Sequence, residues 1–234
     1  MAHPHLRFIA LASSLLAFGC DSTPVVEAPP IDWSALDAEF ERVIAEEALE
    51  GATVAIVHRT YGLIHVRAYG GFEVDRVTLL ASAGKMVSVG VIMRLADRGL
   101  IDLDAPISTY LGDLGQYKTD ITIAQLLSNS SGLVGLIDDP TYAPYICQYL
   151  WFGTLASCTG SIYTADDAAD RVPPDTEFHY GGGQWQLAGG IAEHVSGKRW
   201  AELVDETYTR PCELDTLGYS NHFLDSISLE GPLA

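Results

Sequence analysis

The sequence predicts an α/β (α+β) protein, in which a helical domain stands beside an antiparallel sheet domain that is incomplete in this chain. Three observations predict this fold class. A helix-periodic segment is followed directly by two strand-like runs, strand signal becomes scarce after Tyr69, and helical apolar patterns fill most of the remaining chain. Because a two-stranded hairpin is only marginally stable by itself, the sheet needs further strands, which the chain does not obviously supply.

Composition and charge narrow the class of protein. A hydrophobic fraction of 48% and a charged fraction of 19% are typical of a globular protein with a sizeable core. The net charge of −18 is spread along the chain and does not form a tail. Nucleic-acid binding requires clustered Lys and Arg side chains, so nucleic acid is excluded as an expected partner.

The first twenty residues are expected to be an export signal. Arg7 precedes an apolar run from Phe8 to Phe18 that is too short to span a bilayer. The stretch 17–20 resembles a bacterial lipobox, which predicts lipidation of Cys20 and a lipoprotein anchored in the cell envelope or periplasm. The alternative is a plain signal peptide with an incidental cysteine. Residues 21–31 are rich in proline and are predicted to be a linker.

The first part of the sheet domain is expected over residues 32–80. A helix starting at Asp32 places apolar side chains on one face, and Gly51 can end it. The runs 52–58 and 63–69 are strand-like, and a turn ending at Gly62 joins them. The pattern therefore predicts a β-hairpin on which the helix packs.

The helical domain is expected over residues 81–210. Nearly continuous apolar residues after Lys85 predict a buried helix that ends at Gly99. Shorter helices are predicted within the stretches 102–114, 121–133 and 165–171, and longer ones over 184–196 and from Arg199 to the break at Pro211. The stretch 138–165 is rich in aromatic residues, Gly and Pro, and is interpreted as an irregular excursion. Residues 211–234 are expected to begin a return to the sheet domain.

Cysteine spacing predicts one disulfide. Cys147 and Cys158 are eleven positions apart, and an oxidising envelope compartment would favour their pairing. Cys212 remains and is expected to be a buried thiol. Neither a CxxC nor an HExxH spacing occurs, so no metal site and no cofactor are expected.

Ser82 and Lys85 form the most chemically suggestive pair. Side chains at i and i+3 of a helix share one face, and the positive end of the helix disfavours a nearby ammonium. A neutral Lys85 could then accept the proton of Ser82 and make its hydroxyl a nucleophile, while the Ser82 backbone N–H could help to hold an oxyanion. The alternative is that Ser82 merely caps the helix and Lys85 is solvated, because serine is a common N-cap.

The flanking sequence resembles the serine β-lactamase and penicillin-binding-protein superfamily. Ser82-x-x-Lys85 is followed by an apolar helix, then by "RGLIDLDAPISTYLGD" and "ITIAQLLSNSSGL". This order is similar to that of class C β-lactamases and their esterase and D-aminopeptidase relatives, and the resemblance runs from about residue 54 to 221. The resemblance implies that Ser82 is the nucleophile and Lys85 its base.

A second motif of that branch, Tyr-x-Asn, is similar to the stretch "PPDTEFHYGGGQWQ", which places Tyr180 at the tyrosine. The resemblance implies that Tyr180 shuttles protons, and that Gly181 and Gly182 line the substrate's path. The alternative is a half-buried aromatic residue before a glycine turn. Gly182 replaces the asparagine whose amide is expected to contact the acyl-amide group of β-lactams, so an esterase-like or peptidase-like site is favoured. Asn129 stands where many relatives carry histidine.

The third motif of the family, Lys-Thr-Gly or His-x-Gly, is not found in the sequence, and "YKTD" (117–120) lacks its glycine. The chain therefore resembles a relative truncated at its C-terminus. We expect a monomeric serine hydrolase that acts through an acyl-enzyme on small-molecule or peptide substrates: esters, D-amino-acid peptides or β-lactams. The alternative is a truncated, catalytically inactive relative or a binding protein.

Overall fold

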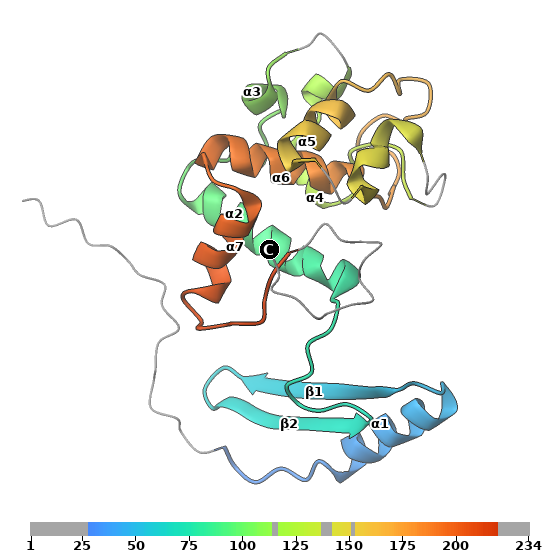
Figure 1. Ribbon diagram of the computed structural model, residues 1–234, viewed down its shortest axis with the longest axis vertical. Helices are drawn as coiled ribbons and strands as arrows, with labels where there is room; N and C mark the ends of the chain where they lie inside the picture. The colour runs from blue at the N-terminus through green and yellow to red at the C-terminus, as the bar shows by residue number, and fades with distance from the viewer. Residues whose placement is uncertain (1–27, 114–116, 137–141, 151–152, 220–234) are drawn as a thin grey trace, which may run out of the picture. The chain divides into compact units, whose positions relative to one another are not determined.

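The computed structural model describes residues 28–113, 117–136, 142–150 and 153–219 (Figure 1). The chain divides into two compact units, Met1–Arg76 and Val77–Ala234. Within the described ranges, none of the helices is both long and apolar enough to cross a lipid bilayer.

The first unit contains helix α1 (Ser34–Glu46) and strands β1 (Gly51–His58) and β2 (Gly62–Gly70) (Figure 1). The two strands pair antiparallel, which confirms the predicted hairpin. Helix α1 packs on the hairpin through Phe40, whose ring stacks on that of Tyr69 with centroids 4.9 Å apart. The Tyr69 hydroxyl also donates a 2.6 Å hydrogen bond to Asp37 of α1.

The sheet of this unit has two strands among the described residues, and its core is small. Tyr69 is the one buried residue in the described part of the unit. Three large apolar side chains of the hairpin are exposed: Val57, Leu63 and Val66. A helix with an incompletely covered two-stranded sheet agrees with the predicted fold class and its incomplete sheet domain.

Helices are the main regular structure in the described part of the second unit. Its described elements are η1 (Ala81–Ala83), α2 (Gly84–Asp97), α3 (Ser108–Leu111), η2 (Tyr117–Asp120), α4 (Ile123–Leu127), η3 (Ala143–Tyr149), α5 (Leu155–Tyr163), α6 (Gly183–Ser196), α7 (Trp200–Val204) and the π-helical turn η4 (Asp205–Thr209). An isolated antiparallel bridge joins Pro106 and Thr122.

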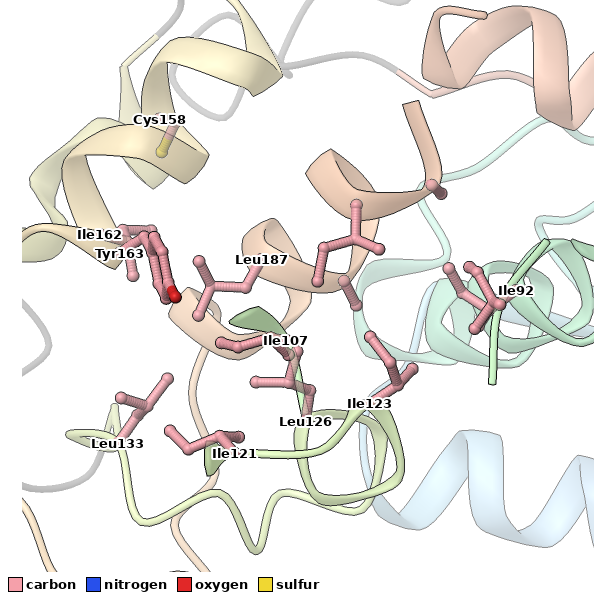
Figure 2. Close-up of a cluster of buried hydrophobic side chains, with 14 of the residues drawn as sticks. Ile92, Ile107, Ile121, Ile123, Leu126, Leu133, Cys158, Ile162, Tyr163 and Leu187 are labelled. Carbon is pink, nitrogen blue, oxygen red and sulfur yellow. The ribbon is translucent and has the colours of Figure 1, made fainter. Parts of the chain in front are cut away.

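Helix α6 supplies the centre of the hydrophobic core. Leu187 and Ile191, four positions apart, are both fully buried, because such spacing puts side chains on one face of a helix. Figure 2 shows Leu187 among side chains from α2, α4 and α5, including Ile92, Leu126 and Ile162. Gly197, with φ of +67°, ends α6 in the left-handed conformation that glycine adopts without a Cβ penalty.

Two sequence-based predictions of secondary structure are wrong. The stretch 138–165, expected to be irregular, contains η3 and helix α5 in its described part. Helix α5 begins with a capping box, because the hydroxyls of Thr154 and Ser157 accept hydrogen bonds from each other's backbone N–H groups. The stretch 165–171, expected to be a helix, is irregular and contains a turn in which the Asp170 N–H donates to the Asp167 carbonyl. The Ala165 carbonyl and the Asp167 carboxylate bind the buried ammonium of Lys118.

Cys212 also differs from its prediction. It is exposed and is not the expected buried thiol, because it lies in the turn after Pro211 that follows η4. Its backbone N–H donates to the carbonyl of Tyr208. The chain beyond residue 219 and the predicted signal segment 1–20 lie outside the described residues.

Candidate active site

Ser82 lies in η1, immediately before helix α2. Ala83 is the N-cap of α2, and no side chain accepts a capping hydrogen bond there. The Ser82 hydroxyl is exposed and makes hydrogen bonds with Lys85 and Tyr180. The alternative that Ser82 serves as a helix cap is therefore contradicted. Ala81, which precedes Ser82, has a φ of +44°, a conformation that is strained for a residue with a Cβ.

Lys85 connects the other two side chains of the cluster. Its Nζ lies 3.1 Å from the Oγ of Ser82 and 2.8 Å from the phenol oxygen of Tyr180. The Ser82 hydroxyl and the Tyr180 phenol are themselves hydrogen-bonded, so the three groups form a closed triangle. The ammonium also lies 4.7 Å from the ring centroid of Tyr180 and 5.7 Å from that of Trp185, where the faces of the rings favour a cation.

The triangle changes the acidity of the tyrosine. The hydrogen bond from the Lys85 ammonium, with a second from Ser82, holds the pKa of the Tyr180 phenol below its ordinary value, because both favour the phenolate. A phenolate at this position would accept hydrogen bonds from both neighbours. The arrangement can therefore move a proton from the serine hydroxyl to the tyrosine while the ammonium balances the negative charge.

The segment that carries Tyr180 is held through its backbone. Its carbonyl accepts a 2.5 Å hydrogen bond from the N–H of Leu136. The neighbouring His179 donates its N–H to the carbonyl of Asn129 at 2.9 Å, and its own carbonyl accepts from Nε2 of Gln184 at 2.7 Å. These contacts fix the position of the phenol opposite α2.

Asn129 and Gln184 are positioning residues whose contacts the sequence analysis did not predict. The Oδ1 of Asn129, a residue with a φ of +58°, accepts hydrogen bonds from Gln184 at 2.6 Å and from the indole N–H of Trp185 at 3.2 Å. The hydroxyl of Ser131 donates to the other end of the Gln184 amide at 2.6 Å. The available sequence signal for Gln184 was its position as a polar residue on the otherwise apolar, buried face of α6.

The glycine run after Tyr180 lies against other parts of the helical unit. A Cβ at Gly181 would lie 3.1 Å from the Val134 carbonyl oxygen. One at Gly182 would lie 1.9 Å from Oε1 of Gln148, and one at Gly183 would lie 2.9 Å from the ring of Tyr145. Substrate contact at Gly181 and Gly182 stays a prediction.

The structure joins Cys147 of η3 and Cys158 of α5 in a disulfide. Cys20 lies outside the described residues. Lys118, from the "YKTD" stretch, takes no part in the Ser82 cluster, because its ammonium is buried against Asp167 and the Ile162 carbonyl. Among the residues that the structure describes, no group of three or more His, Cys, Asp or Glu side chains is arranged to hold a metal ion.

The helical unit and its Ser–Lys–Tyr cluster define a class, that of serine β-lactamases and penicillin-binding proteins. Comparison with known families agrees, because the family described as Beta-lactamase matches residues 36–222. The chain therefore belongs to the β-lactamase family.

The names of the chain's curated relatives describe different kinds of protein, an esterase and a penicillin-binding protein among them. Esterase EstB of Burkholderia gladioli is 34% identical over 203 residues, which cover 79% of this chain and 50% of the esterase. Penicillin-binding protein 4 of Amycolatopsis lactamdurans is 23% identical over 79% of this chain and 49% of its own length. The chain thus spans about half the length of these curated relatives.

Solved structures share the fold. A putative β-lactamase from Bacteroides dorei has a TM-score of 0.64 at 29% identity, over 78% of this chain and 52% of that protein. A D-stereospecific amidohydrolase from Streptomyces has a TM-score of 0.61 at 22% identity, over 79% of this chain and 55% of that protein. The β-lactamase/transpeptidase-like fold class is therefore confirmed.

Proposed function

We propose that this protein is a serine hydrolase that forms an acyl-enzyme on Ser82. The observation that carries the proposal is the closed hydrogen-bonded triangle of Ser82, Lys85 and Tyr180 in a member of the β-lactamase family. A serine hydroxyl is a weak nucleophile, and it becomes effective when a base lies within hydrogen-bonding distance.

In the proposed reaction, the Oγ of Ser82 attacks the substrate carbonyl carbon, and its proton passes to the Lys85–Tyr180 pair. The backbone N–H of Ser82 helps to stabilise the oxyanion. Tyr180 then gives the proton to the leaving group, whose bond to the carbonyl carbon breaks. A water molecule, deprotonated by the same pair, finally attacks the acyl carbon. The bond from this carbon to Oγ breaks, and the pair returns the proton to Ser82.

Esters are the substrate class that we propose first, followed by short D-amino-acid peptides and β-lactams. Gly182 provides no side-chain amide at the position where the Tyr-x-Asn motif has one. The name of the Burkholderia gladioli esterase and that of the Streptomyces amidohydrolase support ester and D-amino-acid substrates for related proteins.

Covalent labelling tests the proposal. The purified chain without residues 1–20 is treated with a fluorophosphonate, and the modified residue is identified by peptide mass spectrometry. We expect an adduct on Ser82 that is lost in Ser82→Ala and retained in Ser161→Ala, a control serine exposed on α5. A folded sample, shown by circular dichroism, that gives no adduct would refute the hydrolase and favour a binding protein.

We also propose that the protein is exported and lipidated at Cys20. The disulfide between Cys147 and Cys158 supports an oxidising compartment, where such bonds persist. Bacteria that express the chain should incorporate labelled palmitate, and Cys20→Ser should abolish the incorporation. Incorporation that persists in the variant would contradict lipidation at this residue.

A further inference from the structure

Tyr219 contacts the start of the helix that carries Lys85. Its hydroxyl donates a 2.6 Å hydrogen bond to the carbonyl of Gly84, the first residue of α2, which lies 135 positions earlier in the chain. The Ser88 hydroxyl, one turn further along α2, lies 2.7 Å from the Tyr219 oxygen and 3.2 Å from the Gly84 carbonyl. A phenol has one proton and a carbonyl only accepts, so Ser88 donates to the Tyr219 oxygen. These three groups form a second hydrogen-bonded triangle, two residues along the chain from Ser82.

Gly84 connects this second triangle to the nucleophile. Its N–H donates to the carbonyls of Ala81 and Ser82, while its own carbonyl accepts from Tyr219. The chain passes from the 3₁₀ turn η1 to the α-helix α2 at this residue, between Ser82 and Lys85. The orientation of the Ser82 hydroxyl relative to the Lys85 ammonium therefore depends on the backbone of Gly84. A donor that fixes the Gly84 carbonyl also fixes this orientation.

Tyr219 is itself held by elements other than α2. Its ring packs edge-on against that of Trp200 in α7, with centroids 5.7 Å apart, and the Trp200 N–H donates to Glu193 of α6 at 2.7 Å. Tyr219 is half-buried against the hydrophobic core. Burial raises the pKa of its phenol above the ordinary value, so the hydroxyl keeps its proton and stays a donor. The hydrogen bond to Gly84 thus ties the start of α2 to the α6–α7 part of the unit.

We propose that Tyr219 is a positioning residue for the reaction of Ser82. Its hydrogen bond to Gly84 holds the turn between Ser82 and Lys85 in the shape that brings the Lys85 ammonium to 3.1 Å from Oγ and 2.8 Å from the Tyr180 phenol. Small displacements of such groups reduce the rate of a reaction steeply. This inference rests on the proposed function, because the geometry it maintains serves proton transfer from Ser82.

Tyr208 provides a matched control. It comes from η4, and its hydroxyl donates to another carbonyl of α2, that of Val87, at 3.1 Å. Val87 follows Lys85 in the chain, so this contact lies outside the turn between Ser82 and Lys85. Replacement of either tyrosine by phenylalanine removes one hydroxyl that is bonded to an α2 carbonyl. The two variants should therefore lose similar amounts of thermal stability, measured as Tm by circular dichroism.

The rate at which an alkyl fluorophosphonate labels Ser82 is measured over a range of pH, below the Tm of every variant. In Tyr219→Phe we expect a fall of about fivefold, which corresponds to about 1 kcal/mol. The midpoint of the pH dependence should also move upward, toward the ordinary tyrosine pKa of about 10, because Lys85 is held less firmly against Tyr180. A loss of packing alone would not move this midpoint. In Tyr208→Phe the rate should stay within twofold and the midpoint should not change.

A double variant removes the remaining donor. In Tyr219→Phe the Ser88 hydroxyl is still 3.2 Å from the Gly84 carbonyl and can partly replace the phenol. Tyr219→Phe combined with Ser88→Ala should therefore label more slowly than Tyr219→Phe alone. A double variant as fast as the unaltered chain would overturn the role of this hydrogen bond.

The outcomes separate this inference from the proposed function. Equal rates and equal midpoints in Tyr219→Phe and Tyr208→Phe would overturn the positioning role and leave the hydrolase intact, because Tyr219 would then only attach its segment to α2. A slower Tyr219→Phe with an unchanged midpoint would also overturn it. If the folded, unaltered chain is not labelled at all, the proposed function is overturned, and this inference with it.

Discussion

Replacing Lys118 by methionine should destabilise the helical unit by about 3–5 kcal/mol, the usual cost of breaking a buried ion pair. The ammonium of Lys118 is fully buried, and oxygen atoms of three described residues accept its hydrogen bonds. These are Oδ2 of Asp167 at 2.9 Å, the Ile162 carbonyl at 2.6 Å and the Ala165 carbonyl at 3.1 Å. Methionine fills similar space but leaves the carboxylate and both carbonyls without this donor.

Burial and pairing act in opposite directions on these two charges. Burial lowers the pKa of Lys118 and raises the pKa of Asp167, because desolvation penalises each charged form. The 2.9 Å contact between them opposes both shifts. Loss of the ammonium removes the charge that is paired with Asp167 and leaves it with the hydrogen bond from Tyr145 and the more distant charge of Arg171. The other carboxylate oxygen, Oδ1, has no hydrogen-bond partner among the described residues.

Thermal unfolding followed by circular dichroism measures the effect. For a chain of this size, 1 kcal/mol corresponds to roughly 2–4 °C in Tm, so a fall of about 10 °C is expected. Lys198→Met is the matched control, because the ammonium of Lys198 pairs with Glu206 at a partly exposed site. Such pairs contribute roughly 0–1 kcal/mol, so the control should shift Tm by no more than about 3 °C.

A double variant distinguishes the ion pair from general packing. Lys118→Met combined with Asp167→Leu removes both charges, and it should be more stable than Lys118→Met alone. If Lys118→Met lowers Tm by no more than Lys198→Met does, the reasoning is refuted.

Three other predictions depend on local geometry. Ser82 labelling should rise with pH as the Tyr180 phenolate forms. In Lys85→Gln the midpoint of the pH dependence of labelling should move upward, toward the ordinary tyrosine pKa of about 10, whereas Lys85→Arg, which keeps the cation, should hold this midpoint lower. Equal midpoints in the two variants would contradict this. Ala81→Gly should raise the free energy of unfolding by about 1 kcal/mol in urea titrations, because φ of +44° penalises a Cβ, and a loss of stability would refute it. Gly190→Ala should cost about 1–3 kcal/mol, because its Cβ would lie 1.9 Å from Oγ1 of Thr159. In Gly160→Ala the added Cβ meets open space on α5, so this variant should be more stable by about 0.5–1 kcal/mol. Similar changes in stability for the Gly190 and Gly160 variants would be evidence against close α5–α6 packing.

Local patterns predicted the hairpin and the long helices, because both depend on neighbours a few positions apart. The period of apolar residues predicted α6 to within one residue of its observed start. Helix α5 was missed because its sequence, "LASCTGSIY", has few large apolar residues, and its Thr154 and Ser157 capping box lacks the usual Glu or Gln.

Spacing also brought Ser82 and Lys85 together, but only the resemblance to a family added Tyr180, which is 98 positions from Ser82. Neither spacing nor the family resemblance predicted the contacts of Gln184 and Lys118. Gln184 bonds to Asn129, 55 positions away, and Lys118 to the carbonyl of Ile162, 44 positions away. Pairs this distant depend on tertiary packing, which a periodic pattern in one sequence does not encode.

The three lysines of the chain show how the same side chain acquires different roles from its surroundings. Lys85 is partly buried beside two hydroxyl groups and two aromatic rings, where its charge can stabilise a phenolate. Lys118 is fully buried with its donors satisfied by the protein, so it has no capacity left for a substrate, and Lys198 is half-exposed in an ordinary ion pair. The "YKTD" lysine therefore cannot substitute for the lysine of a third catalytic motif in this fold, because releasing its ammonium would break the contacts that hold Asp167, which also accepts a hydrogen bond from the buried Tyr145.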